Sequence, residues 1–160
     1  MATLERLLDH LDENHSEYLH TTHEMAFKAK EVACAEHLLP CHFAKAVVVH
    51  TEGGFGMAVL PADCELDLKD LRTALGTHHA RLATEEELGR LFPECELGAM
   101  PPVGGLFGLP VYVESSMAAD ATIAFNAGTH HDVVHMRFQD YEALVKPAFM
   151  PIAKPLAARA

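Results

Sequence analysis

Hydrophobic and polar residues follow two different periods in successive short segments of the chain. Residues 3–13 hold four leucines at the i, i+3, i+4, i+7 spacing, which predicts an amphipathic helix with Thr3 as its cap. Residues 43–51 hold a run of three valines, and a continuous β-branched run is typical of a strand buried on both faces. The two kinds of segment together indicate a chain that mixes helices and strands.

The remaining segments extend this mixture. The same reasoning predicts further strands at residues 16–22, 55–60, 81–83 and 111–114, and further helices at residues 26–37, 68–75, 85–92 and 141–145. We expect Asp67, Thr84 and Asp140 to cap the last three of these helices, and Gly76 to end the first of the three. Residues 98–110 are rich in Gly and Pro, which predicts an irregular segment.

The stretch at residues 122–138 reads as strand, tight turn and strand. Its apolar residues recur at every second position before the turn, which is the period of a strand. Asn126 and Gly128 are turn residues, and glycine adopts positive φ without steric cost. The doublet His130-His131 follows, before the chain becomes apolar again. A polar turn with two imidazoles between two strands is a favourable place to hold a small ligand.

These elements predict an α+β fold, with a twisted, mostly antiparallel sheet or partial barrel flanked by helices. A chain of 160 residues has the length of one domain. We assign residues 1–147 to that domain and residues 148–160 to a Pro- and Ala-rich tail, which packs as an extended strap or stays loose. No apolar run approaches the ~20 residues of a membrane span and no secretory leader opens the chain, so we expect a cytoplasmic protein with no membrane partner.

Charge and cysteine content narrow the function classes. The formal net charge is −11 with histidine neutral, which argues against a broad nucleic-acid footprint. The chain has twelve histidines, so its surface charge should change strongly around the imidazole pKa of ~6.5. The four cysteines show no CxxC spacing, and we expect reduced thiols.

Three features carry candidate chemistry, and each has a plainer explanation. Lys45, near the start of a buried strand, would meet a phosphate or a carbonyl, or it simply extends its ammonium to solvent from the sheet edge. The loop at residues 98–110 offers backbone N–H groups for an oxyanion, or it is an ordinary surface connection. An imidazole in the turn at residues 126–132 would position a water, or the turn residues bond only local backbone.

A metal site is not expected from the ligand spacing. His131 and His135 are four residues apart in a predicted strand, which places them two pleats apart. The closely spaced thiols and imidazoles between residues 34 and 42 match no tight zinc pattern. No nucleophile elbow, phosphate-binding loop or dinucleotide fingerprint is present, and we predict no cofactor.

Read together, residues 20–147 resemble the YbaK/EbsC family, which includes the insertion domain of prolyl-tRNA synthetase and the free-standing ProX-type deacylases. The resemblance rests on several motifs in order. These are HEMAFKAKEVA at 23–33, AKAVVVH at 44–50, ELDLKDLRTALG at 65–76, LATEEEL at 82–88, GAMPPVG at 98–104 as the GxxxP loop, and FNAGTH at 125–130 as the late turn.

This resemblance implies a mixed α/β domain that hydrolyses the ester between a wrong amino acid and the 3′ end of a tRNA, without a metal. It implies a small amino acid on tRNA-Pro and the tRNA acceptor end as partner. The acidic charge adds a hypothesis of our own, in which a synthetase is a second partner that supplies most of the affinity. Lys45 would meet the terminal adenosine or its phosphate. The implied catalytic set is Lys45, His130 and Gly98, and the implied substrate-binding set is Pro102, Met100, Gly128, Thr129 and Asn126.

Two points stay open at this level. The doublet leaves undecided whether His130 or His131 matches the family histidine. Besides a deacylase, the sequence allows a non-catalytic binding or regulatory module on the same fold, or a histidine-rich metal-binding protein.

Overall fold

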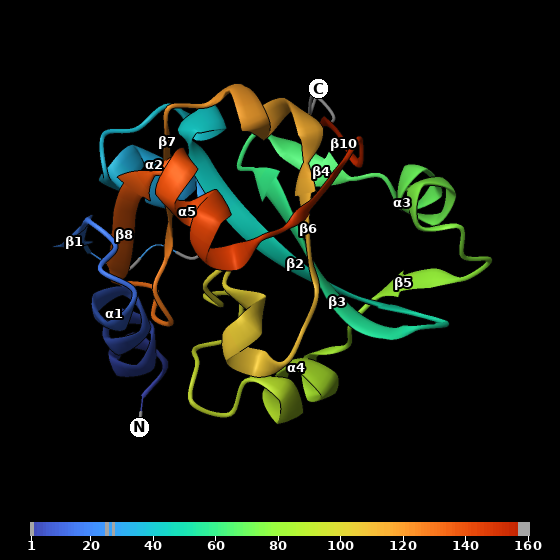
Figure 1. Ribbon diagram of the computed structural model, residues 1–160, viewed down its shortest axis with the longest axis horizontal. Helices are drawn as coiled ribbons and strands as arrows, with labels where there is room; N and C mark the ends of the chain where they lie inside the picture. Colours follow the sequence, from blue (N-terminus) through green and yellow to red (C-terminus); the bar gives the residue numbers. More distant parts are fainter. Residues whose placement is uncertain (1, 25, 27, 157–160) are drawn as a thin grey trace.

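A mixed β-sheet runs through the centre of the molecule, with helices on both of its faces (Figure 1). The computed structural model describes residues 2–24, 26 and 28–156. The eight-stranded sheet has the order β1-β8-β7-β2-β3-β6-β9, and β5 pairs with β2 outside this path. Its strands are β1 (Tyr18–Thr22), β2 (Phe43–Thr51), β3 (Gly54–Pro61), β5 (Ala80–Leu82), β6 (Val111–Glu114), β7 (Thr122–Asn126), β8 (Asp132–Arg137) and β9 (Ala148–Met150).

Most of the strand pairs are antiparallel, as the sequence predicts. The hairpins β2–β3 and β7–β8 and the pair β1–β8 are antiparallel. The pairs β2–β7, β3–β6 and β6–β9 are parallel. The central strand β2 therefore has β3 on one side and β7 on the other. The turn that follows β7 begins beside β2.

Helices cover the two faces of this sheet. They are α1 (Thr3–Glu13), α2 (Ala29–Ala35), α3 (Leu68–Leu75), α4 (Glu85–Leu91) and α5 (Phe138–Val145), with short 3-10 helices η1 (Pro40–His42), η2 (Gly104–Phe107) and η3 (Ser115–Ala119). The main core packs α1 and α5 against one face, with Leu7, Phe125 and Tyr141 fully buried. Among the described residues, no helix has the length and apolar content needed to cross a membrane.

The two faces of β2 meet different clusters. Ala44 and Val48 point into the main core. Phe43 packs with a second cluster under α2, and Val49 packs with a third cluster under α3. Lys45 lies on the same face of β2 as Phe43 and Val49, as predicted, and on the opposite face from Ala44 and Val48.

Several helix boundaries follow the predicted local chemistry. The Asp67 carboxylate accepts from the amide of Asp70 at 3.1 Å and caps α3, which ends at Gly76 with φ of +65°. Thr84 and Glu87 form the capping box of α4. These are interactions between near neighbours in the chain, which explains why the sequence predicts them.

Three helix predictions are wrong in detail. Ala2 precedes α1 as its cap, and Thr3 is already helical and buried. Helix α5 begins at Phe138, so Asp140 lies in its first turn and pairs with Arg137 at 2.9 Å instead of capping. The helix predicted at residues 26–37 is observed only as α2.

The shorter α2 has a physical cause on each side. At its start, the amides of His23 and Ala26 donate to the carbonyls of His131 and His130, so this segment bonds to the turn and not to itself. At its end, His37 has φ of +58°. Part of the prediction falls on Phe27, which lies outside the described residues.

The C-terminal tail is a strap of two short strands. Strand β9 pairs with β6, and β10 (Ala153–Pro155) pairs with β4 (Cys64–Leu66). Between them Ile152 is fully buried, and its amide donates to the Glu114 carboxylate at 3.0 Å. Strands β4, β9 and β10 were not expected from the sequence.

Candidate active site

Two backbone hydrogen bonds join the turn between β7 and β8 to the segment at residues 96–99. The Gly128 amide donates to the Ala99 carbonyl and the Glu96 amide donates to the Gly128 carbonyl, both at 2.9 Å. Gly128 has φ of +97°, and a Cβ built on it would lie 2.9 Å from the Cβ of Thr3. Any larger residue would be strained in its backbone and would collide with the start of α1.

His130 is the imidazole of the doublet that bonds this segment. The residue is 6% exposed. Its Nε2 donates to the Leu97 carbonyl at 2.8 Å, and its amide donates to the Glu96 carboxylate at 3.1 Å. Gly98 has φ of +85°, and a Cβ built on it would lie 3.7 Å from Cε1 of His130. The structure therefore places two of the predicted catalytic residues, His130 and Gly98, side by side.

Thr129 and His131 bond other partners. The Thr129 hydroxyl donates to the Asp132 carboxylate at 2.6 Å and accepts from the amides of His131 and Asp132 at 3.1 and 3.0 Å. The His131 ring donates through Nδ1 to the His23 carbonyl at 3.2 Å. The hydroxyl of Thr129 thus organises the turn, and the two imidazoles of the doublet hold different segments of the chain.

Lys45 lines a pocket of about 340 Å³ together with two other lysines. The pocket is formed by Lys28, Ala29, Lys30, Lys45, Ala62 and Leu156. Burial lowers the pKa of Lys45, and the positive charge of Lys30 acts in the same direction, against the carboxylates of Asp63 and Glu65. Three cationic side chains around one hollow in a chain of net charge −11 make a favourable place for an anion.

The strand register puts Asn126 on the same face of the sheet as this lysine. The parallel register pairs Phe43 with Ala124 and Ala44 with Phe125. Continued by one residue, it places Asn126 beside Lys45 on the same face. Asn126 is 6% exposed, and its side-chain oxygen has no hydrogen-bond partner among the described residues. A buried amide oxygen without a partner is costly, so it marks a position where a ligand or water would bind.

Two of the predicted substrate-binding side chains lie elsewhere. Met100 packs in the main core, on the opposite face of the sheet from Lys45. Pro102 is also buried, and its carbonyl accepts from the Tyr141 hydroxyl at 2.6 Å. The structure does not bring these two side chains to the Lys45 pocket, and only the backbone of their loop remains available for binding.

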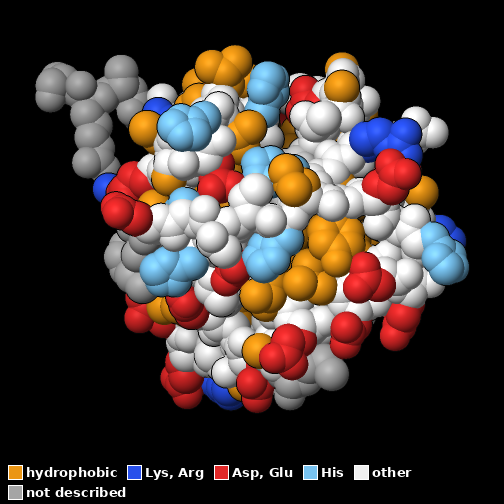
Figure 2. Space-filling view, turned by 90° about the vertical axis from the view of Figure 1, so that its left-hand side faces the viewer, with side chains coloured by type: hydrophobic (Ala, Val, Ile, Leu, Met, Phe, Trp, Pro, Cys, Tyr) orange, Lys and Arg blue, Asp and Glu red, His pale blue; other side chains and the backbone are white. Residues whose placement is uncertain are grey.

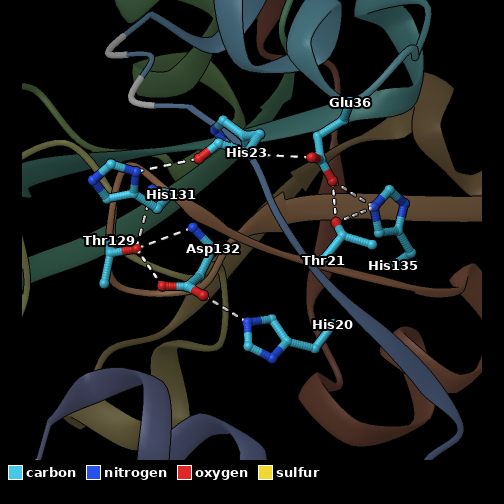
Figure 3. Close-up of polar contacts among 8 residues, drawn as sticks. All are labelled: His20, Thr21, His23, Glu36, Thr129, His131, Asp132 and His135. Carbon is cyan, nitrogen blue, oxygen red and sulfur yellow. Dashed lines mark hydrogen bonds and ion pairs between the residues drawn. The ribbon is translucent and has the colours of Figure 1, made fainter.

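The buried carboxylate of Glu36 connects several segments next to the turn between β7 and β8 (Figure 3). Glu36 accepts from the Thr21 hydroxyl, from Nδ1 of His23 at 3.1 Å and from Nε2 of His135 at 3.0 Å. The side chains of His23 and Glu36 are 4% and 5% exposed. Burial raises the pKa of Glu36, but the hydrogen bonds from Thr21 and His135 lower it further, and the net pKa is below its ordinary value.

A second carboxylate, that of Asp132, connects the same turn to β1. Asp132 accepts from Nε2 of His20 at 2.7 Å as well as from Thr129. Burial acts to raise its pKa, and these two hydrogen bonds outweigh burial and lower it. Figure 3 shows both carboxylates connecting β1, β8 and the segment that contains His23. The two networks fix the turn on which His130 stands.

Histidines are also spread over the face that carries α1 and β1, among acidic side chains (Figure 2). Within the part of the chain that the structure describes, no three His, Cys, Asp or Glu side chains are grouped so that they could hold a metal ion. The His131 ring donates to the His23 carbonyl, and the His135 ring donates to the Glu36 carboxylate.

Sequence reasoning missed some of the residues that shape this site. The pocket lysines Lys28 and Lys30 could have been noticed, because half of the lysines in the chain fall between residues 28 and 45. The role of Glu36 had no such signal, because its partners come from β1 and β8, far away in the sequence.

Comparisons with known proteins identify the family and the fold of this chain. The sequence model of one family, described as the aminoacyl-tRNA editing domain, matches residues 23–144. The multifunctional Ser/Thr-tRNA deacylase ProXp-y of Escherichia coli is 28% identical over 157 residues, which cover 91% of this chain and 90% of the relative. A crystal structure of a candidate trans-editing enzyme for prolyl-tRNA synthetase superposes with a TM-score of 0.83 at 22% identity, covering 96% of this chain and 98% of the other. A crystal structure of a hypothetical protein gives 0.84 at 14% identity, covering 93% and 99%.

Proposed function

Because the chain belongs to the aminoacyl-tRNA editing domain family, we propose that it hydrolyses the ester that joins a mismatched amino acid to the 3′ end of a tRNA. The observation that carries this proposal is the lysine pocket, together with Asn126 on the same face of the sheet as Lys45. It offers positive charge for a phosphate and an unpaired buried amide oxygen for a polar ligand group. The turn with His130 begins directly after Asn126.

Most of the predicted residues keep a role in this proposal, but the side chains of Met100 and Pro102 do not. Lys45 binds the terminal adenosine or its phosphate as a point charge. Its ammonium is already partly buried in the free protein, so less water has to be removed from it on binding. Asn126 accepts a hydrogen bond from the bound ester's amino or hydroxyl groups. His130, with the backbone of Gly128 and Thr129, orders the amino-acid end and the attacking water.

Backbone amides of the loop at residues 98–102 hold the ester carbonyl as it becomes an oxyanion. Pro101 and Pro102 have no N–H, and the Ala99 amide already donates to the Glu96 carbonyl. The donors left in this loop are the amides of Gly98 and Met100, which make no hydrogen bond within the described residues. An aminoacyl ester is already activated, so positioning a water and stabilising the oxyanion suffice without a nucleophile or a metal.

The substrate that we propose is a small amino acid, with tRNA-Pro as the first candidate acceptor. The relative that acts on Ser/Thr-tRNA supports serine and threonine as further candidates. A synthetase cannot reject such small residues by binding alone, which is the reason for a separate hydrolytic site.

The deacylation of a panel of mischarged tRNAs by the purified protein tests this proposal. The panel contains Ala-, Ser- and Thr-tRNA species, including Ala-tRNA-Pro, with correctly charged Pro-tRNA-Pro as the negative control. We expect at least one small amino acid to be released well above the spontaneous rate, and we expect EDTA to leave that rate unchanged. No hydrolysis across the panel would instead support a binding module on the same fold.

Two finer points belong to the same proposal. The net charge of −11 leads us to propose that a synthetase supplies much of the affinity for tRNA, in the cytoplasm where charged tRNA is used. A pull-down with synthetases and a band shift with tRNA alone address this. Tight independent binding of tRNA would contradict the need for the partner.

A further inference from the structure

A second hollow lies at the far end of β2 from the Lys45 pocket. It has a volume of about 420 Å³ and is formed by the β2–β3 hairpin, α3, β5 and the residues between them. Its lining residues are His50, Thr51, Glu52, Arg72, His78, His79, Ala80 and Arg81. Two arginines and three histidines therefore face one hollow that contains a single carboxylate, in a chain that is strongly acidic.

The two arginines of this hollow differ in whether their guanidinium groups are already paired within the protein. Arg81 is already paired with Glu87 through two hydrogen bonds of 2.7 and 3.0 Å. Arg72 is partly buried, and its side chain makes no ion pair or hydrogen bond within the described residues. The Glu52 carboxylate accepts from the amide of His78 at 2.9 Å, which fixes the loop after α3 on the hairpin. Arg72 is thus the available guanidinium on a preformed surface, and arginine matches the geometry of phosphate.

The position of this hollow fits a ligand that is long and carries repeated charges. His50 follows Lys45 by five residues on the same strand, which corresponds to roughly 17 Å. The helix that carries Arg72 packs through Leu71 on Val49, which shares the face of Lys45. Figure 1 shows α3, β5 and the end of the hairpin together on one side of the molecule, away from α1 and β1.

We propose that this hollow, through Arg72 and the imidazoles of His78 and His79, binds a backbone phosphate of the tRNA acceptor end while the charged 3′ terminus occupies the Lys45 pocket. This inference rests on the proposed function, because it takes the same tRNA as the ligand of both sites. Two anchors along one strand hold the RNA in a single direction. A local site with one available guanidinium also explains how an acidic chain contacts RNA without a broad basic face.

Equilibrium binding of uncharged tRNA, measured by fluorescence anisotropy at several salt concentrations, tests the hollow without any need for catalysis. The variants are Arg72→Glu, the charge-conserving Arg72→Lys, and the control Arg90→Glu on α4, an exposed arginine outside the hollow. We expect Arg72→Glu to weaken binding about tenfold and to lower the salt dependence by roughly one phosphate contact. Arg72→Lys should retain most of the affinity, and Arg90→Glu should match wild type.

A second measurement separates this inference from the proposed function. For the mischarged tRNA that is hydrolysed, Arg72→Glu should raise KM and leave kcat unchanged. It should leave hydrolysis of an aminoacyl-adenosine ester, which lacks upstream phosphates, at the wild-type rate. Unchanged tRNA binding in Arg72→Glu, an equal loss in Arg90→Glu, or an equal loss on the short ester would overturn the inference. A wild-type protein that binds tRNA through Arg72 but hydrolyses nothing would refute only the proposed function.

Discussion

At the scale of single residues, Lys45 shows how a functional group can be costly to the fold. Its ammonium is partly buried beside Lys30, and the resulting fall in its pKa shows that the charged form is less well solvated than in water. A residue kept only for stability would not need this charge. A buried charge that lowers stability is typical of binding and catalytic sites.

We therefore expect Lys45→Met to separate stability from activity. Methionine fills a similar volume without the desolvation cost, so Tm should stay the same or rise by roughly 2–4 °C. Deacylation by the same variant should fall. Thermal unfolding followed by circular dichroism measures the first effect. Lys69→Met, at an exposed lysine of α3, is the control and should change neither property. A large fall in Tm in Lys45→Met would indicate a structural lysine.

Glu36 gives a second prediction at this scale, on pH. Its pKa is lower in the folded protein than the ordinary value of 4.5, so its stabilising effect is complete above that value and is lost as the pH falls through the folded pKa. Glu36→Gln should cost about 2 kcal/mol of unfolding free energy at pH 7, because the buried donors lose a charged acceptor. Below about pH 5 the difference from wild type should shrink.

Urea unfolding of both proteins between neutral and acid pH measures this effect. Glu13→Gln, at an exposed carboxylate at the end of α1, provides the control and should show no such dependence. A difference between Glu36→Gln and wild type that stays constant down to acid pH would contradict the assignment of the stabilisation to the ionised carboxylate.

At the scale of elements, the β7–β8 hairpin connects the fold to the site. Its turn holds His130, contacts the start of α1 through Gly128, and bonds the loop at residues 96–99. The strands on either side of the turn were predictable, because alternation is a local pattern. The neighbours of the turn were not predictable in this way, because they come from distant parts of the chain.

Gly128→Ala is the substitution that tests this connection. The positive φ and the 2.9 Å approach to Thr3 should together cost more than about 2 kcal/mol of unfolding free energy. Gly89→Ala makes the same chemical change inside α4, where a new Cβ meets nothing within 4 Å. That variant should gain about 0.5–1 kcal/mol. Denaturant unfolding compares the two, and equal effects would show that the turn is not constrained as described.

The limits of prediction at this scale have a common cause. Caps at Asp67 and Thr84 were predictable because they involve residues three apart. The cap predicted at Asp140 was wrong because the helix already begins at Phe138, which places that carboxylate in its first turn. Within the candidate site, a motif pointed to Lys45, and another motif pointed to the doublet without deciding between His130 and His131. The packing of Met100 in the core and the network around Glu36 could not be predicted, because both depend on which strands become neighbours.

At the scale of the whole molecule, the C-terminal strap decides where the domain ends. The sequence suggested a boundary after residue 147. In the structure, β9 and β10 pair with β6 and β4, and Ile152 is fully buried between them. The Glu114 carboxylate accepts from the amides of Ile152 and Ala153 at 3.0 and 3.1 Å.

Truncation after residue 147 should therefore destabilise the protein strongly. It removes Ile152, whose loss alone is equivalent to a large-to-small core change of roughly 2–5 kcal/mol, and it leaves Glu114 without two donors. Truncation after residue 156 retains both strands and should leave Tm nearly unchanged. Calorimetry of the two shortened chains decides between a separable tail and an integral strap. Equal stability of both truncations with the full chain would favour the separable tail.

The most direct test of the proposed chemistry is the single-turnover rate of deacylation on the best mischarged tRNA of the panel, compared between wild type and Lys45→Ala. We expect wild type to hydrolyse the ester far faster than buffer and Lys45→Ala to be slower by roughly 10²-fold, because the 3′ end of the tRNA is no longer held in position. Lys69→Ala should keep the wild-type rate. His130→Ala should also be slower. If Lys45→Ala and His130→Ala both keep the wild-type rate, the reaction does not occur at the site described.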